Sequence, residues 1–289
     1  MLKLYFALPL LLIFSLFTGM EINPVSTSRL DAGMAICHSE PLNDMRQWAM
    51  DPEFQALHPA PVSIIFEGIG AEITMPAADG MEAKGYLVKA KKKSNKWLFV
   101  YQEWWGLNDY IRREADKFYK DLGENVNVLA LDMYDGKSTS DPQEAGKLIS
   151  STKEERLINI VKAGYDFAGA KAQVASVGWC FGGSWSLRSA IIGGKNNIGS
   201  VIYYGMPVDK IDELKKLNSD VLGLFATETR ISKEVIEKFA ENMKAAGKGL
   251  EYKIFPGVHG FANPSNPKYD KENAEVAYGM ALKYLKGKF

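Results

Sequence analysis

The spacing of apolar positions along the chain changes at Trp97. Before it, short stretches with apolar residues at 63–67, 71–75 and 83–90 are separated by polar residues, and Asp79-Gly80 is typical of a turn. This pattern predicts strands joined as an antiparallel hairpin. After Trp97, short apolar runs alternate with longer segments in which apolar residues recur every three or four positions, as expected for strands that alternate with helices.

The second part of the chain therefore predicts a mostly parallel sheet with helices on both faces, an α/β fold, because its strand-like runs are apolar throughout. Helix 109–122 illustrates the helical period, with Ile111, Ala115 and Phe118 on one face. We expect strands at 97–102, 126–131, 174–177, 200–204, 221–226 and 251–255, and helices at 109–122, 141–170 with a break near 150–152, 184–192, 232–246 and 271–285.

Length and charge narrow the class of protein. The 289 residues are 46% hydrophobic and 24% charged, which suits one large α/β domain with a sizeable core. The formal net charge is zero, and the only basic block, Lys91-Lys92-Lys93, lies between two predicted strands as a solvated turn. We therefore expect no nucleic-acid partner.

The N-terminus has the pattern of a signal peptide. Lys3 precedes an uncharged apolar run at 4–17, which is short for a membrane span. We expect a signal peptide at 1–20, with a cleavage site as late as 37, an N-terminal extension at 21–60 with a short helix at 44–56, and the α/β domain at 61–289. The protein would then be exported, periplasmic or secreted, without a stable membrane span; the alternative is an uncleaved signal anchor that tethers it to the membrane.

The run Gly178-Trp179-Cys180-Phe181-Gly182-Gly183 lies between a predicted strand and a predicted helix. A sharp, glycine-bounded turn of this kind is a nucleophile elbow, here with cysteine in place of the usual serine. The amino end of the following helix favours the reactive thiolate. The alternative is a buried cysteine in a glycine-rich turn.

The chain has two cysteines, Cys37 and Cys180, and a disulfide between them would consume the proposed nucleophile. We therefore expect Cys180 to be unpaired, and a redox role lacks a partner cysteine. No histidines and cysteines cluster along the sequence, so the residues imply no metal and no cofactor.

A cysteine nucleophile needs a base and an orienting acid. Of the three histidines, His38 and His58 precede the predicted core, whereas His259 follows its last strand. Among α/β-hydrolases the order is nucleophile, acid, histidine, which places the acid after strand 221–226, where Glu228 is the carboxylate. Its alternative role is a surface ion pair with Arg230.

Glu103 ends the strand that begins at Trp97 and precedes Trp104-Trp105. Strand ends at that edge of a parallel sheet line the active-site crevice. A carboxylate there would raise the pKa of a nearby thiol and hold its proton in the resting state. The two indoles either line an apolar substrate pocket or pack in the core.

Four motifs taken together resemble the dienelactone hydrolase family over about residues 62 to 288. They are Gln102-Glu103-Trp104-Trp105-Gly106-Leu107-Asn108, the cysteine elbow, Tyr203-Tyr204-Gly205 and His259-Gly260-Phe261-Ala262-Asn263-Pro264. The resemblance implies an α/β-hydrolase fold and a Cys-Asp-His triad. It makes Cys180 the nucleophile and His259 the base.

The resemblance also assigns supporting roles. The backbone N–H groups of Trp104 and Phe181 would form the oxyanion hole, and Glu103 would contact the cysteine before substrate arrives. Trp105, Tyr134 and Phe261 would bind substrate.

The sequence departs from the family pattern at the acid. The family aspartate falls on Thr229, so Glu228 or another carboxylate must replace it, or the triad is degraded. Where family members bind a substrate carboxylate with two arginines, this chain has Gly136-Lys137 and Asn263. This weakens the case for dienelactone itself as the substrate.

The sequence predicts a cysteine-dependent hydrolase of small-molecule esters or lactones that forms an acyl-enzyme. A hydrolase of other activated esters is the alternative among enzymes, and a non-catalytic α/β-hydrolase-fold binding protein is the alternative from another class. The oligomeric state is not predicted.

Overall fold

The computed structural model describes residues 45–46 and 48–289. The predicted signal peptide, its cleavage site, Cys37 and His38 lie outside these residues. None of the helices formed by the described residues combines the length and apolar character needed to cross a membrane.

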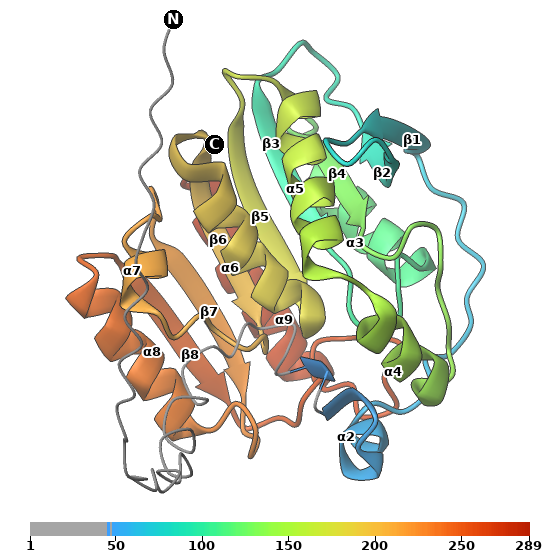
Figure 1. Cartoon of the computed structure of the whole chain (residues 1–289), viewed down its shortest axis with the longest axis vertical. Helices are drawn as coiled ribbons and strands as arrows, with labels where there is room; N and C mark the ends of the chain where they lie inside the picture. Colours follow the sequence, from blue (N-terminus) through green and yellow to red (C-terminus); the bar gives the residue numbers. More distant parts are fainter. Residues whose placement is uncertain (1–44, 47) are drawn as a thin grey trace, which may run out of the picture. The chain divides into compact units, whose positions relative to one another are not determined.

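In the described part of the chain, eight strands form one sheet in the order β1-β2-β4-β3-β5-β6-β7-β8 (Figure 1). The strands are β1 (Ala71–Pro76), β2 (Glu82–Val88), β3 (Lys96–Tyr101), β4 (Asn127–Asp132), β5 (Gln173–Trp179), β6 (Asn197–Tyr203), β7 (Val221–Ala226) and β8 (Leu250–Phe255). β1 and β2 pair antiparallel and β2 pairs antiparallel with β4, whereas all other neighbours are parallel. The predicted α/β fold is confirmed.

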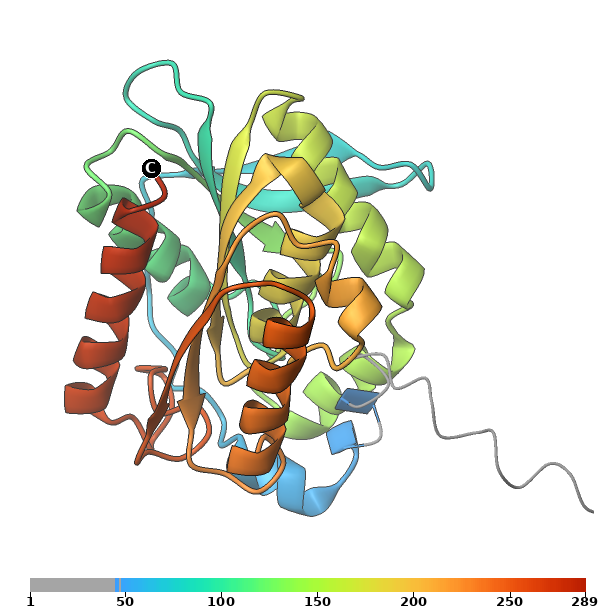
Figure 2. The ribbon, with the colours of Figure 1, turned by 90° about the vertical axis from the view of Figure 1, so that its left-hand side faces the viewer.

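Helices cover both faces of the sheet. They are α2 (Pro52–Leu57), α3 (Asp109–Asp121), α4 (Pro142–Ser151), α5 (Glu154–Ala168), α6 (Phe181–Gly193), α7 (Ile211–Leu214), α8 (Lys233–Ala245) and α9 (Lys271–Lys286). In Figure 2, α3 and α9 lie on one side of the sheet and α5, α6 and α8 on the other. Side-chain caps fix where several of them begin: Asn108 accepts a hydrogen bond from Ile111 N, and Ser232 accepts one from Val235 N.

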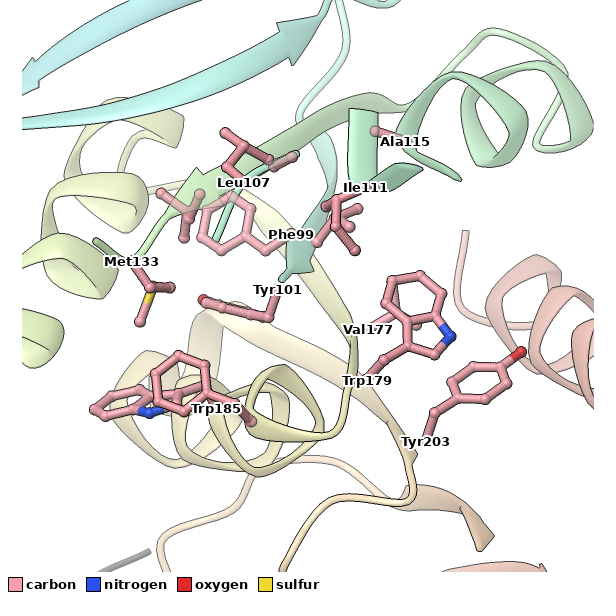
Figure 3. Packing of buried hydrophobic residues seen from close by; sticks show 14 of the residues in the cluster. Phe99, Tyr101, Leu107, Ile111, Ala115, Met133, Val177, Trp179, Trp185 and Tyr203 are labelled. Atoms are coloured by element: carbon pink, nitrogen blue, oxygen red, sulfur yellow. The ribbon is translucent and has the colours of Figure 1, made fainter. Parts of the chain in front are cut away.

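Large side chains fill the space between the central strands and their helices (Figure 3). The Trp179 and Tyr203 rings stack with centroids 5.3 Å apart, and both are buried. On the other face of the sheet, the Tyr101 hydroxyl donates to Ser189 Oγ on α6 at 2.7 Å. Burying each large apolar side chain contributes roughly 1.5–3 kcal/mol, so these contacts hold β3, β5 and β6 in fixed register.

Several predicted elements differ from the structure. Residues 63–67 form no strand: Ile65 is 98% exposed, and the backbone on either side bonds to a loop and a helix, through Val62 N to Ser265 O and Ile69 N to Asp116 Oδ2. The β-branched residues of this segment favour extended backbone, which is why a strand was predicted. No neighbouring strand pairs with the segment, so it remains outside the sheet. Helix α6 begins at Phe181, directly after Cys180, and not at 184.

A segment of the N-terminal extension, residues 45–46 and 48–60, which we call the strap, lies over the carboxyl edge of the parallel strands, with α2 beside α4 in Figures 1 and 2. Asp51 caps α2, and Arg230, from the loop after β7, donates to its carboxylate at 2.7 Å. Arg46 hydrogen-bonds to the Thr152 carbonyl at the end of α4. The strap is thus attached to two separate parts of the α/β domain.

Candidate active site

Cys180 occupies a sharp turn between β5 and α6, with φ 54° and ψ −118°. A Cβ on Gly178 would lie 2.1 Å from Gly182 O, and one on Gly182 would lie 2.3 Å from Tyr101 O. Neither position accepts a side chain, because backbone atoms cannot move aside as a flexible side chain could. Positive φ at a non-glycine residue costs about 1–3 kcal/mol, and the tightly packed turn maintains it.

The Cys180 thiol is buried, with 3% of the residue exposed, and it is a free cysteine. Burial raises its pKa above the ordinary value, while His259 and the Phe181 N–H at the start of α6 oppose that rise. The resting sulfur is therefore held as the thiol, with groups beside it that stabilise the thiolate once the proton leaves.

The His259 imidazole is fixed by Glu228. Its Nδ1 lies 2.8 Å from Glu228 Oε1, and both side chains are buried. Burial alone would lower the pKa of His259, but the Glu228 carboxylate and the Cys180 sulfur, once it loses its proton, outweigh burial and raise the pKa well above its usual range, so that the ring can accept that proton. The loop after β7, which carries Glu228, is also joined to the loop after β8, which carries His259, since Thr227 N donates a hydrogen bond to Gly257 O at 2.9 Å.

The alternative partner for Glu228 is not observed, since Arg230 pairs with Asp51 on the strap. Thr229, at the position of the family aspartate, is exposed. Glu228 is thus the carboxylate that the fold brings to the imidazole.

Glu103 lies at the end of β3 and is 6% exposed. Tyr204 donates a hydrogen bond to its Oε1 at 3.3 Å, and the Asn263 amide donates to its Oε2. Burial raises the pKa of Glu103 to about 7, against the lowering effects of His259, Asn263 and Tyr204. Asn263, which stands where family members have an arginine, therefore holds this carboxyl in place.

His58, at the end of α2 in the strap, is a site residue that the sequence analysis left out. Its Nε2 lies 3.6 Å from Cys180 Sγ, and its Nδ1 lies 2.8 Å from Phe54 O. A carbonyl oxygen only accepts, so Nδ1 carries the proton and Nε2 presents its lone pair to the sulfur. Burial lowers the pKa of His58 well below its usual value, so the ring is neutral.

The sequence did contain one sign that the segment around His58 docks onto the domain, namely aromatic residues in an otherwise polar stretch. Phe54 is buried, and its ring lies 4.3 Å from the His58 ring and 5.5 Å from the Trp104 ring, centroid to centroid. Trp48 packs against it at 6.4 Å. Large aromatic side chains are usually buried, so two of them in a short polar segment indicate that the segment docks onto the domain.

Two histidines and a cysteine that are far apart along the sequence cluster in the structure. One ring nitrogen from each of His58 and His259, together with Cys180 Sγ, lie within 4.8 Å of one another. The rings of the two histidines are 4.7 Å apart. The sequence could not show this cluster because its members are separated by 122 and 79 positions along the chain.

Aromatic side chains surround the thiol. The Trp104 ring packs between His58 at 4.6 Å and Trp105 at 4.9 Å, and the Tyr134 ring lies 5.4 Å from that of Phe181. The remaining predicted substrate-binding residue, Phe261, is fully buried and packs against the Tyr204 ring at 5.6 Å.

Three buried polar atoms at the site make no hydrogen bond within the described residues: Trp104 Nε1, Tyr134 Oη and His259 Nε2. An unsatisfied buried polar atom costs about 1–3 kcal/mol. Groups of this kind are retained where a ligand or a reacting group completes them. They are therefore candidates for contacts with a bound molecule.

The chain is similar in sequence to proteins of one known family. The model of the "Dienelactone hydrolase family" matches residues 83–289. The chain is 27% identical to "Protein usf" of Aquifex pyrophilus over 223 residues, which cover 72% of this chain and 94% of that protein. It is 24% identical to "Carboxymethylenebutenolidase 1" of Cupriavidus pinatubonensis, covering 75% of this chain and 95% of that one.

The fold is also found among solved structures. A dienelactone hydrolase-like promiscuous phosphotriesterase from metagenomic libraries superposes with a TM-score of 0.64 at 19% identity. The superposition covers 77% of this chain and 100% of that one. The sheet and its helices are thus those of the α/β-hydrolase structures.

Proposed function

Because the chain belongs to the dienelactone hydrolase family, we propose that it hydrolyses small carboxylic esters or lactones with Cys180 as its nucleophile. It is a dienelactone hydrolase-like hydrolase that acts on small molecules. The cysteine mechanism and the choice of substrate are what the proposal adds.

One observation carries the mechanism: a ring nitrogen of His259 lies within 4.8 Å of Cys180 Sγ, while Nδ1 of the same ring is held 2.8 Å from Glu228. This is the order of contacts that nucleophilic catalysis needs, with the base oriented by a third group. Glu228 takes the place of the family aspartate, because its longer side chain reaches the imidazole from the adjacent position.

The reaction proceeds in two stages. His259 takes the thiol proton, and the thiolate of Cys180 attacks the substrate carbonyl carbon. The N–H groups of Trp104 and Phe181 stabilise the oxyanion. The C–O bond to the leaving group then breaks, and the alkoxide takes the proton from His259. Water, deprotonated by His259, attacks the acyl carbon; the C–S bond breaks, the acyl group leaves as a carboxylic acid, and the Cys180 thiolate takes the proton back from His259.

The lining of the site favours a neutral substrate. Gly136-Lys137 and Asn263 stand where two arginines of family members would bind a carboxylate; the Asn263 amide is already engaged with Glu103, and Lys137 is exposed at the surface. The donors Trp104 Nε1 and Tyr134 Oη remain for uncharged oxygen atoms of a bound ester. An ester with an apolar acyl group fits these residues better than a dicarboxylate does.

Substrate must displace part of the strap to reach the sulfur, because Cys180 is 3% exposed and His58 covers it. The strap is held by the Asp51–Arg230 pair, by the hydrogen bond from Arg46 to the Thr152 carbonyl and by the buried Phe54 side chain, and its opening leaves the sheet and the helices that cover it in place. We regard the closed arrangement as the resting state.

Hydrolysis of p-nitrophenyl acetate tests the proposal. We expect turnover by the wild-type protein and its loss in Cys180→Ala, with accumulation of an acyl-enzyme detectable by intact-mass analysis. Equal rates for wild type and Cys180→Ala would remove the cysteine mechanism and favour the non-catalytic binding protein.

We further propose that the protein is exported, on the pattern of Lys3 and the apolar run at 4–17. Fractionation of the native host would check this. Full-length chain in the cytosol would contradict it.

A further inference from the structure

We propose that His58, Cys180 and His259 form a metal site of the zinc class, which closes when the strap lies over the nucleophile. The inference goes beyond the hydrolytic function: the site shares Cys180 and His259 with the hydrolytic mechanism but also needs His58, which that mechanism does not use. Its three donors come from α2, from the elbow before α6, and from the loop after β8.

The distances fit the ion without rearrangement of the fold. Cys180 Sγ and His58 Nε2 are 3.6 Å apart. Zinc–sulfur and zinc–nitrogen bonds of about 2.3 and 2.0–2.1 Å at a tetrahedral angle separate sulfur and nitrogen by about 3.5 Å. The third donor, on His259, lies within 4.8 Å of the others, so the side chain of His259 must move closer to the other two donors to complete the set.

Both histidines already have the outer contacts of metal ligands. His58 Nδ1 is bound to the Phe54 carbonyl and His259 Nδ1 to the Glu228 carboxylate. A ligating histidine usually donates its other N–H to an oxygen in this way, which fixes the tautomer and the ring orientation. Each ring therefore keeps Nε2 for the ion, and His259 Nε2 makes no hydrogen bond within the described residues.

The donor set selects the kind of metal. One thiolate and two imidazoles suit a borderline-soft ion such as Zn²⁺, and disfavour Mg²⁺ and Ca²⁺, which prefer oxygen. On binding, the S–H bond of Cys180 is replaced by a sulfur–metal bond, and the proton leaves to solvent. Three protein ligands leave a fourth coordination position open.

A metal at this position would hold the strap shut. The ion ties His58 on α2 to Cys180 and His259 in the α/β domain, across the contact that substrate must open. It also engages the proposed nucleophile and base. The loaded protein should therefore have a protected strap and no esterase activity, both reversed by a chelator.

Cobalt binding to the full chain tests the site without reference to turnover. Co²⁺ bound to a thiolate in tetrahedral geometry gives a sulfur-to-cobalt charge-transfer band and intense visible bands. We expect these bands at one equivalent of Co²⁺, and their loss on addition of Zn²⁺. Cys180→Ser should abolish the charge-transfer band, and His58→Gln should weaken affinity at least about tenfold.

The matched control uses the chain's remaining cysteine and histidine, which are adjacent at Cys37-His38 and could bind the ion themselves. The double variant Cys37→Ser/His38→Gln should keep both the bands and the affinity. His58→Ala provides a second test should His58→Gln not fold, as judged by circular dichroism.

Absence of the bands in wild type, or unchanged affinity in folded His58 variants, would overturn the site. Bands that persist in Cys180→Ser and disappear in the Cys37/His38 variant would place the metal in the extension instead. Because the readout is spectroscopic, an esterase that binds no cobalt refutes the metal site alone. A protein that binds cobalt but shows no esterase activity after a chelator has removed the metal refutes the proposed function alone.

Discussion

The Glu228 carboxylate lies 2.8 Å from His259 Nδ1, although the neighbouring Thr229 holds the sequence position of the family aspartate. The loop after β7 is shaped so that the glutamate side chain points inward and the threonine outward, since Glu228 has a buried side chain and Thr229 is exposed. Glu228, and not the threonine that follows it, is therefore the residue of this loop that faces the imidazole.

The first prediction follows from this contact. Glu228→Gln should lower kcat at least about tenfold, because an amide neither stabilises the imidazolium nor enforces the tautomer as a carboxylate does. The measurement is steady-state kinetics with p-nitrophenyl acetate. Thr229→Ala is the matched control and should change kcat less than about twofold. A larger effect of Thr229→Ala than of Glu228→Gln would show that the acid has been misassigned.

Glu103 makes folding stability depend on pH. Its pKa is raised from 4.5 to about 7 in the folded protein, so the folded state keeps a proton that the unfolded chain has lost. The resulting stabilisation is complete below about pH 4.5 and is lost as the pH rises through 7. The shift corresponds to up to about 3 kcal/mol.

Glu103→Gln should remove this dependence. We expect the difference in unfolding free energy between pH 5 and pH 8 to shrink by up to about 3 kcal/mol relative to wild type, measured by urea denaturation. Glu67→Gln, at an exposed residue, serves as the control. A pH dependence identical in wild type and Glu103→Gln would mean that Glu103 is ionised throughout.

The strap should open more often when its polar anchor is removed. Arg230 pairs with Asp51, and its guanidinium also lies 5.3 Å from the centre of the Phe54 ring. Together such contacts contribute about 1 kcal/mol, equivalent to about a fivefold change in the open population. In a Cys37→Ser background, Arg230→Ala should therefore increase the rate of Cys180 alkylation by iodoacetamide about fivefold.

The control for the strap is Lys216→Ala, which removes an exposed ion pair with Glu213 far along the chain from the strap. It should leave the alkylation rate unchanged. Equal rates in all three proteins would indicate that the strap does not limit access to the sulfur.

The glycines at the elbow should tolerate no side chain. Gly182→Ala should lower the free energy of unfolding by at least about 3 kcal/mol or prevent folding, because its Cβ would lie 2.3 Å from a backbone oxygen. Gly279→Ala in α9 meets nothing within 4 Å and should instead stabilise by about 0.5–1 kcal/mol. Chemical denaturation measures both. A neutral Gly182→Ala would contradict the close packing of the turn.

Local patterns were sufficient for most of the α/β domain. The range of β7 is as predicted, and α3, α8 and α9 differ from their predicted ranges by one or two residues, because capping side chains such as Ser232 and Asp270 mark where helices begin. The strand, turn and helix around Cys180 could also be predicted from neighbouring residues alone, because the glycine spacing and the apolar run lie within one short stretch of sequence.

Only the tertiary structure decided which groups meet the sulfur. His58 is 122 positions from Cys180, and the sequence between them carries no periodicity that records their contact. Whether Glu228 or Thr229 faces His259 likewise depended on the loop's backbone path, which side-chain packing sets after the strands have paired. Short-range propensity determines elements, whereas burial against distant surfaces determines which polar side chains share a site.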